Sequence, residues 1–229
     1  MCGRFTLRTP SQVLVEQFQL ASVPELKPRY NIAPTQPVPV VRQAIPHGAR
    51  HLFLLRWGLV PSWAEDAAIG SRLINARAET VATKPSFRSA FRKRRCLVIA
   101  DGYYEWQKRG AKKQPFFIHR PDGRPFAFAG LWDSWTGGEP GDPPLESCTI
   151  ITTAADDFTR AIHDRMPVIL APNDYSVWLD TAVTDVEPLQ TLLERPLSGE
   201  LAADPITTHV NSPRNDDPRC LEPRRIDEP

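Results

Sequence analysis

Residues 96–119 read CLVIADGYYEWQKRGAKKQPFFIH, and this stretch decides the class of fold. It holds apolar runs at 96–100 and 115–119, each rich in β-branched or aromatic residues and bounded by Asp, Gly or Pro. Runs of about four to eight such residues are typical of buried strands. Similar runs recur at 38–41, 52–55, 126–132 and 148–153. The sequence therefore predicts a fold dominated by strands.

Helical patterns are fewer than strand patterns. After Pro10, which suits a first helical turn, apolar residues follow helical spacing: Val13, Leu14, Phe18 and Leu20. Further helices are predicted at 157–163, 173–179 and 187–193. The proline-rich stretch 24–39 predicts an irregular loop, and 136–144 an exposed one. We expect one α+β domain over residues 1–229, built on a mixed, barrel-like β-sheet with a few peripheral helices and a polar C-terminal tail from about residue 216.

Composition narrows the class of protein. Of the 229 residues, 41% are hydrophobic and 24% charged, which is typical of a soluble globular chain. No run approaches the roughly 20 apolar residues of a membrane span, and the N-terminus lacks a secretory signal. The four cysteines, at 2, 96, 148 and 220, form no CxxC pair, and the five histidines are scattered. We therefore expect a cytoplasmic protein with no metal, no cofactor and no membrane partner.

The formal charge of +1 hides an uneven distribution. Residues 84–113 hold ten basic side chains against two acidic ones, whereas residues 180–229 hold eleven acidic against five basic. A solvated face is the default interpretation of either block. A basic stretch in a neutral protein is also typical of a local phosphate-binding surface.

Cys2 could have a reactivity that no internal cysteine has. If Met1 is removed, the chain begins with a free α-amine and a thiol on adjacent carbons. The amine can attack an aldehyde to form an imine, and the thiol can then close a five-membered thiazolidine ring, which is more durable than the imine. The alternative is that Cys2 is only a small buried residue in a first strand. Cys2 alone does not decide between the two.

Six short motifs run in order along the chain and carry a resemblance. They are MCGRF at 1–5, RYNIAP at 29–34, RWGLVPSW at 56–63, NARAET at 75–80, DGYYEW at 101–106 with KQPFF at 113–117, and IHDRMP at 162–167. A weaker match follows at residues 209–211 and 215–216. In this order they resemble the SRAP family (SOS response-associated peptidase, or abasic-site processing proteins). The resemblance implies covalent capture of abasic sites in single-stranded DNA as part of the DNA damage response.

The resemblance also implies roles for individual residues. Cys2 would condense with the ring-opened deoxyribose, and Asn75 would lie beside the linkage. Glu105 would move protons during ring opening and dehydration. His163 would protonate the sugar oxygen or contact the 3′ side.

The DNA-binding residues that the resemblance implies are of two kinds. Arg4 and Arg77 suit phosphates, while Pro34 and Trp63 match positions that stack on or wedge between bases. Family members often have two consecutive aromatics where this chain has Trp63 and then alanine, so one stacking platform is expected to be weaker. The basic track could extend the path through Arg88, Arg92, Lys93, Arg94 and Arg95. Some of these cations could instead simply face water.

Other functions remain open at this point. Glutamine amidotransferases of the N-terminal nucleophile class also begin Met-Cys-Gly, but they generally need a Gly-Asn-Gly type segment, which is absent here. A cysteine peptidase using Cys2 and His163, limited to removal of Met1 or acting more widely, is compatible with the same residues. A DNA-binding module without catalysis would need only the basic block.

Overall fold

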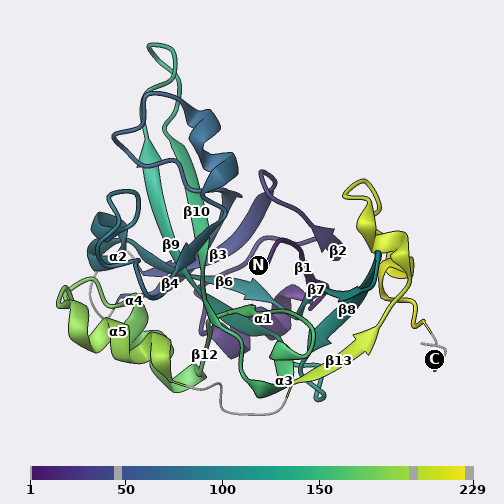
Figure 1. The fold of residues 1–229 in the computed structure, drawn as a ribbon. Coiled ribbons are helices and arrows are strands. Elements are labelled where there is room, and N and C mark those ends of the chain that lie inside the picture. The colour runs from purple at the N-terminus through teal and green to yellow at the C-terminus, as the bar shows by residue number, and fades with distance from the viewer. Residues whose placement is uncertain (1, 44–47, 196–200, 225–229) are drawn as a thin grey trace.

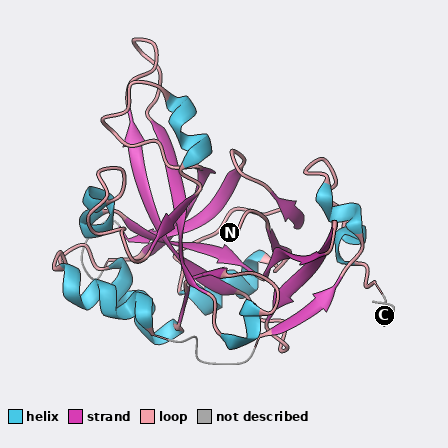
Figure 2. Cartoon of the chain, in the orientation of Figure 1, coloured by secondary structure: helices cyan, strands magenta, loops and turns pink. Residues whose placement is uncertain are grey.

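The computed structural model describes residues 2–43, 48–195 and 201–224. Strands dominate it, as predicted (Figures 1 and 2). Five of them close a ring of pairings: β10–β4, β4–β3, β3–β6, β6–β9 and β9–β10. Their bounds are β3 Pro37–Gln43, β4 Arg50–Trp57, β6 Arg95–Ala100, β9 Phe126–Trp135 and β10 Leu145–Ala154. The predicted α+β class with a mixed, barrel-like sheet is therefore confirmed.

Strand β10 carries two short strands that matter for the site. β5, Asn75–Arg77, pairs with it in parallel, and β11, Arg165–Pro167, pairs with it antiparallel. Thr152 of β10 lies opposite Arg77 on one side and Pro167 on the other. The NARAET and IHDRMP motifs are thus held on opposite edges of one strand. A further short strand, β12 Ile169–Leu170, pairs with β9.

A second sheet of five antiparallel strands contains the N-terminus. Its order is β13-β8-β7-β1-β2, with bounds β1 Phe5–Leu7, β2 Arg29–Ile32, β7 Gly102–Arg109, β8 Lys112–His119 and β13 Ala202–Pro205. β2 and the start of β3 fall inside the stretch 24–39, so the prediction of a loop there is wrong for these residues. Pro24 and Pro28 precede β2, and the remaining prolines lie at Pro34 and in β3, so none interrupts β2.

Side chains alternate across this second sheet, as strand geometry requires. Tyr103 faces the main buried cluster, which also contains Cys2 and residues of the barrel. Tyr104 faces the opposite way, into a smaller cluster completed by the C-terminal segment. The main cluster runs through both sheets, so they form one domain.

The helices cover the outside of the sheets (Figure 2). Four match the predicted positions: α1 Ser11–Phe18, α3 Asp157–Arg160, α4 Tyr175–Leu179 after the short η2 Pro172–Asp174, and α5 Val186–Glu194. The sequence did not predict α2, Arg88–Lys93, or the 3-10 helix η1, Ala67–Arg72. No helix among the described residues is both long and apolar enough to cross a membrane.

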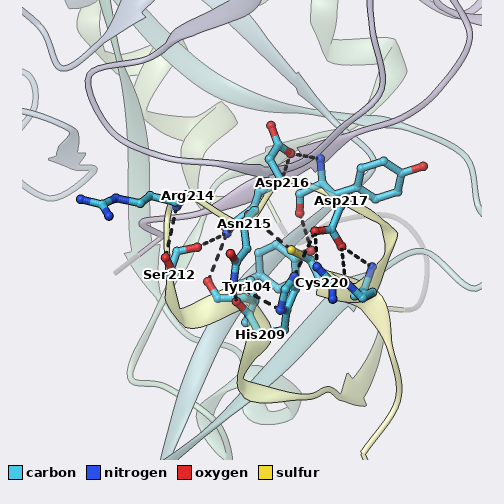
Figure 3. Close-up of polar contacts among 12 residues, drawn as sticks. Tyr104, His209, Ser212, Arg214, Asn215, Asp216, Asp217 and Cys220 are labelled. Carbon is cyan, nitrogen blue, oxygen red and sulfur yellow. Dashed lines mark hydrogen bonds and ion pairs between the residues drawn. The ribbon is translucent and has the colours of Figure 1, made fainter.

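The polar C-terminal segment packs onto the domain as far as Arg224, the last described residue. It forms two 3-10 turns, η3 Thr208–Asn211 and η4 Pro218–Leu221, and buries Cys220. The Asp216 carboxylate accepts hydrogen bonds from the backbone N–H groups of Tyr30 and Asn31 in β2, within the network of Figure 3. The expected polar tail from about residue 216 is therefore part of the fold up to Arg224. Residues 225–229, where fraying was predicted, lie outside the described residues.

Candidate active site

Cys2 and Asn75 join the two sheets at one point. Cys2 lies three residues before β1 and is fully buried, and Asn75 is the first residue of β5. The Asn75 Nδ2 donates a hydrogen bond of 2.8 Å to the Cys2 carbonyl oxygen. The Asn75 Oδ1 is also buried and accepts no hydrogen bond from the described residues. A buried amide oxygen of this kind retains an acceptor site for a ligand.

Glu105 lies on the same face of its strand as Tyr103. Because β1 and β7 pair with Phe5 opposite Tyr103, the carboxylate is directed toward the N-terminal residues. Glu105 is only 2% exposed. Burial raises the pKa of this carboxyl group, and the nearby His163 partly opposes the rise. The group therefore keeps its proton at a higher pH than an exposed glutamate does.

His163 stands between α3 and β11, with its ring beside Glu105. The His163 Nε2 lies 3.9 Å from the Glu105 Oε2. The backbone N–H of Arg165 donates to His163 Nδ1 at 3.0 Å, which places the single proton of a neutral ring on Nε2, toward Glu105. The Asp164 Oδ1, 2.9 Å from the same Nδ1, is available to an imidazolium.

An ion pair joins Arg165, two residues after His163, to the turn that follows β5. Both guanidinium Nη atoms of Arg165 donate to the Glu79 carboxylate, and Nη2 also donates to the Thr152 carbonyl at 2.7 Å. The hydrogen bond from Arg165 lowers the pKa of Glu79. Neither residue was predicted as part of the site, although both lie inside the quoted motifs.

Arg4 is held by the C-terminal segment. Its Nη1 donates to Asn31 Oδ1 at 2.8 Å and to the Val210 carbonyl at 2.9 Å. Asn31 is fully buried, and its Nδ2 in turn donates to carbonyls of the C-terminal segment, the shortest bond being 2.7 Å to Asn215. The guanidinium is therefore fixed in direction before any ligand arrives. Asn31 was missed as a site residue because an asparagine in a strand gives no signal of what it contacts.

The other predicted DNA-binding residues are accessible. Arg77 is exposed and lies two residues after Asn75 in β5, on the same side of the strand. Trp63 is 58% exposed and borders a cavity of about 510 Å³ that η1 also lines. Pro34 is half-buried in the turn between β2 and β3. The Trp135 Nε1 donates to the Ala64 carbonyl at 2.6 Å, which supports the loop behind Trp63.

A cavity of about 470 Å³ opens beside Glu105 and His163. It is lined by Glu105, Trp106, Lys113, His163 and Asn211. The Trp106 Nε1 donates to Asn211 Oδ1 at 2.8 Å, so the C-terminal segment forms one wall. Sequence reasoning did not place Lys113 or Asn211 at the site. The quoted motifs contained both, but only as neighbours of other residues.

Two cations of the predicted basic track bind groups within the protein itself. Arg95 is buried and donates to backbone carbonyls that include Trp178 at 2.6 Å and Phe91 at 3.0 Å, and its burial lowers its pKa to about 10. Arg94 forms an ion pair of 3.2 Å with the buried Asp133. The prediction that Arg95 extends a DNA path is wrong, because its guanidinium ties β6 to α4. Three members of the track stay exposed: Arg88, Arg92 and Lys93.

The Cys2 thiol is in an unusual electrostatic setting for a nucleophile. Its burial raises the pKa well above the usual value, and the Glu105 charge raises it further, while the backbone N–H of Arg4 acts in the opposite direction. The thiol therefore holds its proton at neutral pH until a base removes it. The α-amine of an N-terminal residue has an ordinary pKa of about 7.7–8.0, so part of such an amine is unprotonated near neutral pH.

Comparison with known proteins places this arrangement in a family. The model of the family described as SOS response associated peptidase (SRAP) matches residues 1–213. Abasic site processing protein YoqW of Bacillus subtilis is 42% identical over 227 residues, which cover 97% of this chain and 99% of that protein. Abasic site processing protein YedK of Escherichia coli is 33% identical over 230 residues, which cover 97% and 100%. A crystal structure of a protein from Bacteroides thetaiotaomicron matches with a TM-score of 0.85 and 26% identity, covering 98% of this chain and 100% of that one. The chain belongs to the SRAP family.

Proposed function

We propose that this protein captures abasic sites in single-stranded DNA by forming a thiazolidine between Cys2 and the aldehyde of the lesion. The observation that carries the proposal is the hydrogen bond from Asn75 to the Cys2 carbonyl, with the buried Glu105 and the half-buried His163 nearby. The relatives named abasic site processing proteins support DNA containing abasic sites as the substrate. The crosslink shields the lesion, and a protein acting on genomic DNA works inside the cell.

The chemistry proceeds in two additions. After removal of Met1, the α-amine of Cys2 attacks C1′ of the ring-opened deoxyribose and forms a carbinolamine, which takes up one proton and loses one water to give an iminium ion. The Cys2 Sγ then attacks the same carbon and gives its proton to a base, while the nitrogen keeps its own hydrogen. One aldehyde and one aminothiol thus give one thiazolidine and one water. Neither a metal nor a cofactor is required.

Glu105 suits both proton transfers. Because burial raises its pKa, the protonated carboxyl is available to donate to the departing hydroxyl of the carbinolamine. The resulting carboxylate is then the base that accepts the thiol proton of Cys2. Transfer between two buried groups avoids bringing a separate charge into the site.

The remaining residues bind and orient the sugar. In the neutral tautomer set by the Arg165 N–H, His163 directs its Nε2–H toward Glu105 and the cavity, where it can donate to a sugar oxygen. The Asn75 Oδ1 is the buried acceptor for an N–H of the Cys2 amine. Arg4 and Arg77 bind phosphates on the two sides of the lesion, and Trp63 and Pro34 contact the neighbouring bases.

The raised pKa of the Cys2 thiol favours capture over general peptidase activity. A cysteine peptidase works through a thiolate that a nearby histidine stabilises. Here burial and the Glu105 carboxylate both oppose the thiolate. Attack by the amine comes first in the proposed sequence, so a protonated thiol is not an obstacle.

The experiment uses processed protein and an oligonucleotide with one abasic site, followed by heating and a denaturing gel. We expect a heat-stable adduct with the parent protein and none with Cys2→Ala. Cys2→Ser keeps the amine, so it should form an imine that borohydride traps but no heat-stable adduct. Intact mass establishes that Met1 has been removed in every sample. Absence of an adduct from processed parent protein, or a heat-stable adduct with Cys2→Ser, would overturn the proposal.

A further inference from the structure

The hairpin formed by β7 and β8 has an unusual arrangement of charge. Its strands are joined by a two-residue turn at 110–111, in which Gly110 has a φ of +58°. Beyond Gln107 and Gln114, every cross-strand pair consists of two cations: Lys108 faces Lys113, and Arg109 faces Lys112. All four are exposed. We refer to residues 106–114 as the cationic hairpin.

Like charges directly opposite each other destabilise an antiparallel pair. No acidic side chain among the described residues forms an ion pair with any of the four cations. The Arg109 Nε donates instead to the neutral Gln107 Oε1, at 2.7 Å. The free protein therefore keeps two repulsive pairs that its own side chains do not neutralise. A bound anion would remove the repulsion.

The cationic hairpin is continuous with the active site. Glu105 directly precedes the hairpin in β7, and Trp106 and Lys113 of the hairpin line the same cavity as Glu105. The Gln107 Nε2 donates to the Ala161 carbonyl at 2.7 Å, two residues before His163. The hairpin is therefore anchored beside Glu105 and His163.

The position of the cations indicates the kind of anion. One pair lies on each face of the hairpin, because successive side chains of a strand alternate. A small anion would need converging donors in one pocket, whereas these cations are spread along an extended element. A chain of phosphates fits such a spread, since each phosphate can be contacted separately. A strand held at the cavity through its abasic sugar must also leave the cavity on one side.

We propose that the cationic hairpin binds the phosphates of the DNA strand on one side of the abasic nucleotide. This inference rests on the proposed capture function, in which the abasic sugar occupies the cavity beside Glu105. The hairpin adds affinity for the flanking nucleotides without contacting the reacting atoms. The like-charge pairs are a cost to the stability of the free protein that binding of the strand offsets.

The test compares Arg109→Gln/Lys112→Gln with a control that removes the same charge elsewhere, Lys27→Gln/Arg124→Gln. Arg124 lies just beyond the opposite end of β8, and both control residues are exposed. The DNA probes are short oligonucleotides with a stable tetrahydrofuran abasic analogue, extended on the 5′ side only, the 3′ side only, or neither. Affinity is measured by fluorescence anisotropy over a range of salt concentrations.

We expect the hairpin variant to lose the gain in affinity that one of the two extensions provides, and to match the parent on the unextended probe. Each lost phosphate contact should reduce the slope of log K against log salt by about 0.7, so two contacts give about 1.4. The control variant should keep the gain. An unchanged gain in the hairpin variant, an equal loss for both extensions, or the same loss in the control would overturn the proposal.

Two further readouts complete the test. Lys112→Glu places opposite charges across the hairpin at Arg109, so its melting temperature should rise while its affinity for the extended probe falls. A fall in both would indicate that the hairpin is only structural. Because the tetrahydrofuran analogue has no aldehyde, these measurements do not depend on Cys2. Failure of the capture chemistry would appear instead as a missing adduct with the true abasic probe.

Discussion

The Nε2 atom of His163 lies 3.9 Å from Oε2 of Glu105, although the two residues come from different parts of the fold and are 58 positions apart. Glu105 is in β7 of the N-terminal sheet, and His163 precedes β11 on the barrel. The hydrogen bond from Asn75 to Cys2 crosses the same junction. The candidate site therefore depends on the docking of the two sheets, and its residues can be tested separately.

Glu105→Gln should stabilise the protein and slow capture. The raised pKa means that the folded state holds the Glu105 proton more tightly than the unfolded state does. Stability is therefore lost as the pH rises from the unfolded value, about 4.3, through the raised folded value. Glutamine has no such titration, so the variant should melt higher than the parent at pH 7, and the difference should vanish below about pH 4.

The rate of adduct formation gives the second half of this prediction. Loss of the proton donor should slow single-turnover capture by about 10²–10⁴-fold while leaving affinity for a tetrahydrofuran probe nearly unchanged. The parent rate should fall as Glu105 deprotonates with rising pH, and the rate of the variant should not follow that profile. A large loss of affinity would instead assign Glu105 a structural role.

Asn75→Ala removes the amide that fixes the Cys2 carbonyl. A single neutral hydrogen bond contributes about 0.5–1.5 kcal/mol, so we expect a modest loss of stability. The capture rate should fall more steeply, because both the orientation of Cys2 and the free Oδ1 acceptor are lost together. Thermal melting and single-turnover gels measure the two effects. Equal proportional losses in stability and rate would argue that Asn75 acts only through folding.

The ion pair between Arg165 and Glu79 should contribute to positioning. Because Glu79 is 51% exposed, the coupling in a double-mutant cycle of Arg165→Gln and Glu79→Gln should stay near or below about 1 kcal/mol. The lowered pKa of Glu79 means that this stability is present above the unfolded pKa and is lost as the pH falls through the folded one. Urea unfolding at a series of pH values from 7 downward should show a coupling that declines as acid protonates Glu79. A coupling that does not decline would contradict the assignment.

Trp63→Ala should weaken DNA binding without changing the chemistry. Stacking of one base contributes about 1–3 kcal/mol, which corresponds to roughly 5- to 150-fold in the dissociation constant. The adduct rate at saturating DNA should remain that of the parent. Leu54, which is 56% exposed in β4, provides a control for loss of an exposed apolar side chain. If Leu54→Ala weakens binding equally, stacking is not the cause.

The strands that can be predicted from the sequence are those with continuous apolar runs. The runs at 96–100 and 126–132 became β6 and β9 with only small changes at their ends. β2 escaped prediction because the local signal of its prolines outweighed a short strand of mixed polarity. β13 has little apolar character of its own, and it forms because β8 offers a free edge for pairing.

The candidate site can likewise be predicted only in part from the sequence. The ordered motifs alone indicate Cys2, Asn75, Glu105 and His163, and the structure places Asn75 against Cys2 and His163 against Glu105. The cavity wall at Asn211 could not be found in this way. It depends on a contact between Trp106 and a segment more than 100 residues later in the chain.

The sequence by itself determined the α+β class, the order of the motifs and the chemical option at Cys2, because strand propensity and side-chain chemistry are local properties. Only the tertiary structure decided which charges are available to a ligand. Arg92 and Arg95 belong to the same basic run, yet Arg92 is exposed and Arg95 is buried among backbone carbonyls. The reason is physical: a guanidinium donates wherever unsatisfied acceptors are brought to it, and those acceptors come from residues distant in the chain.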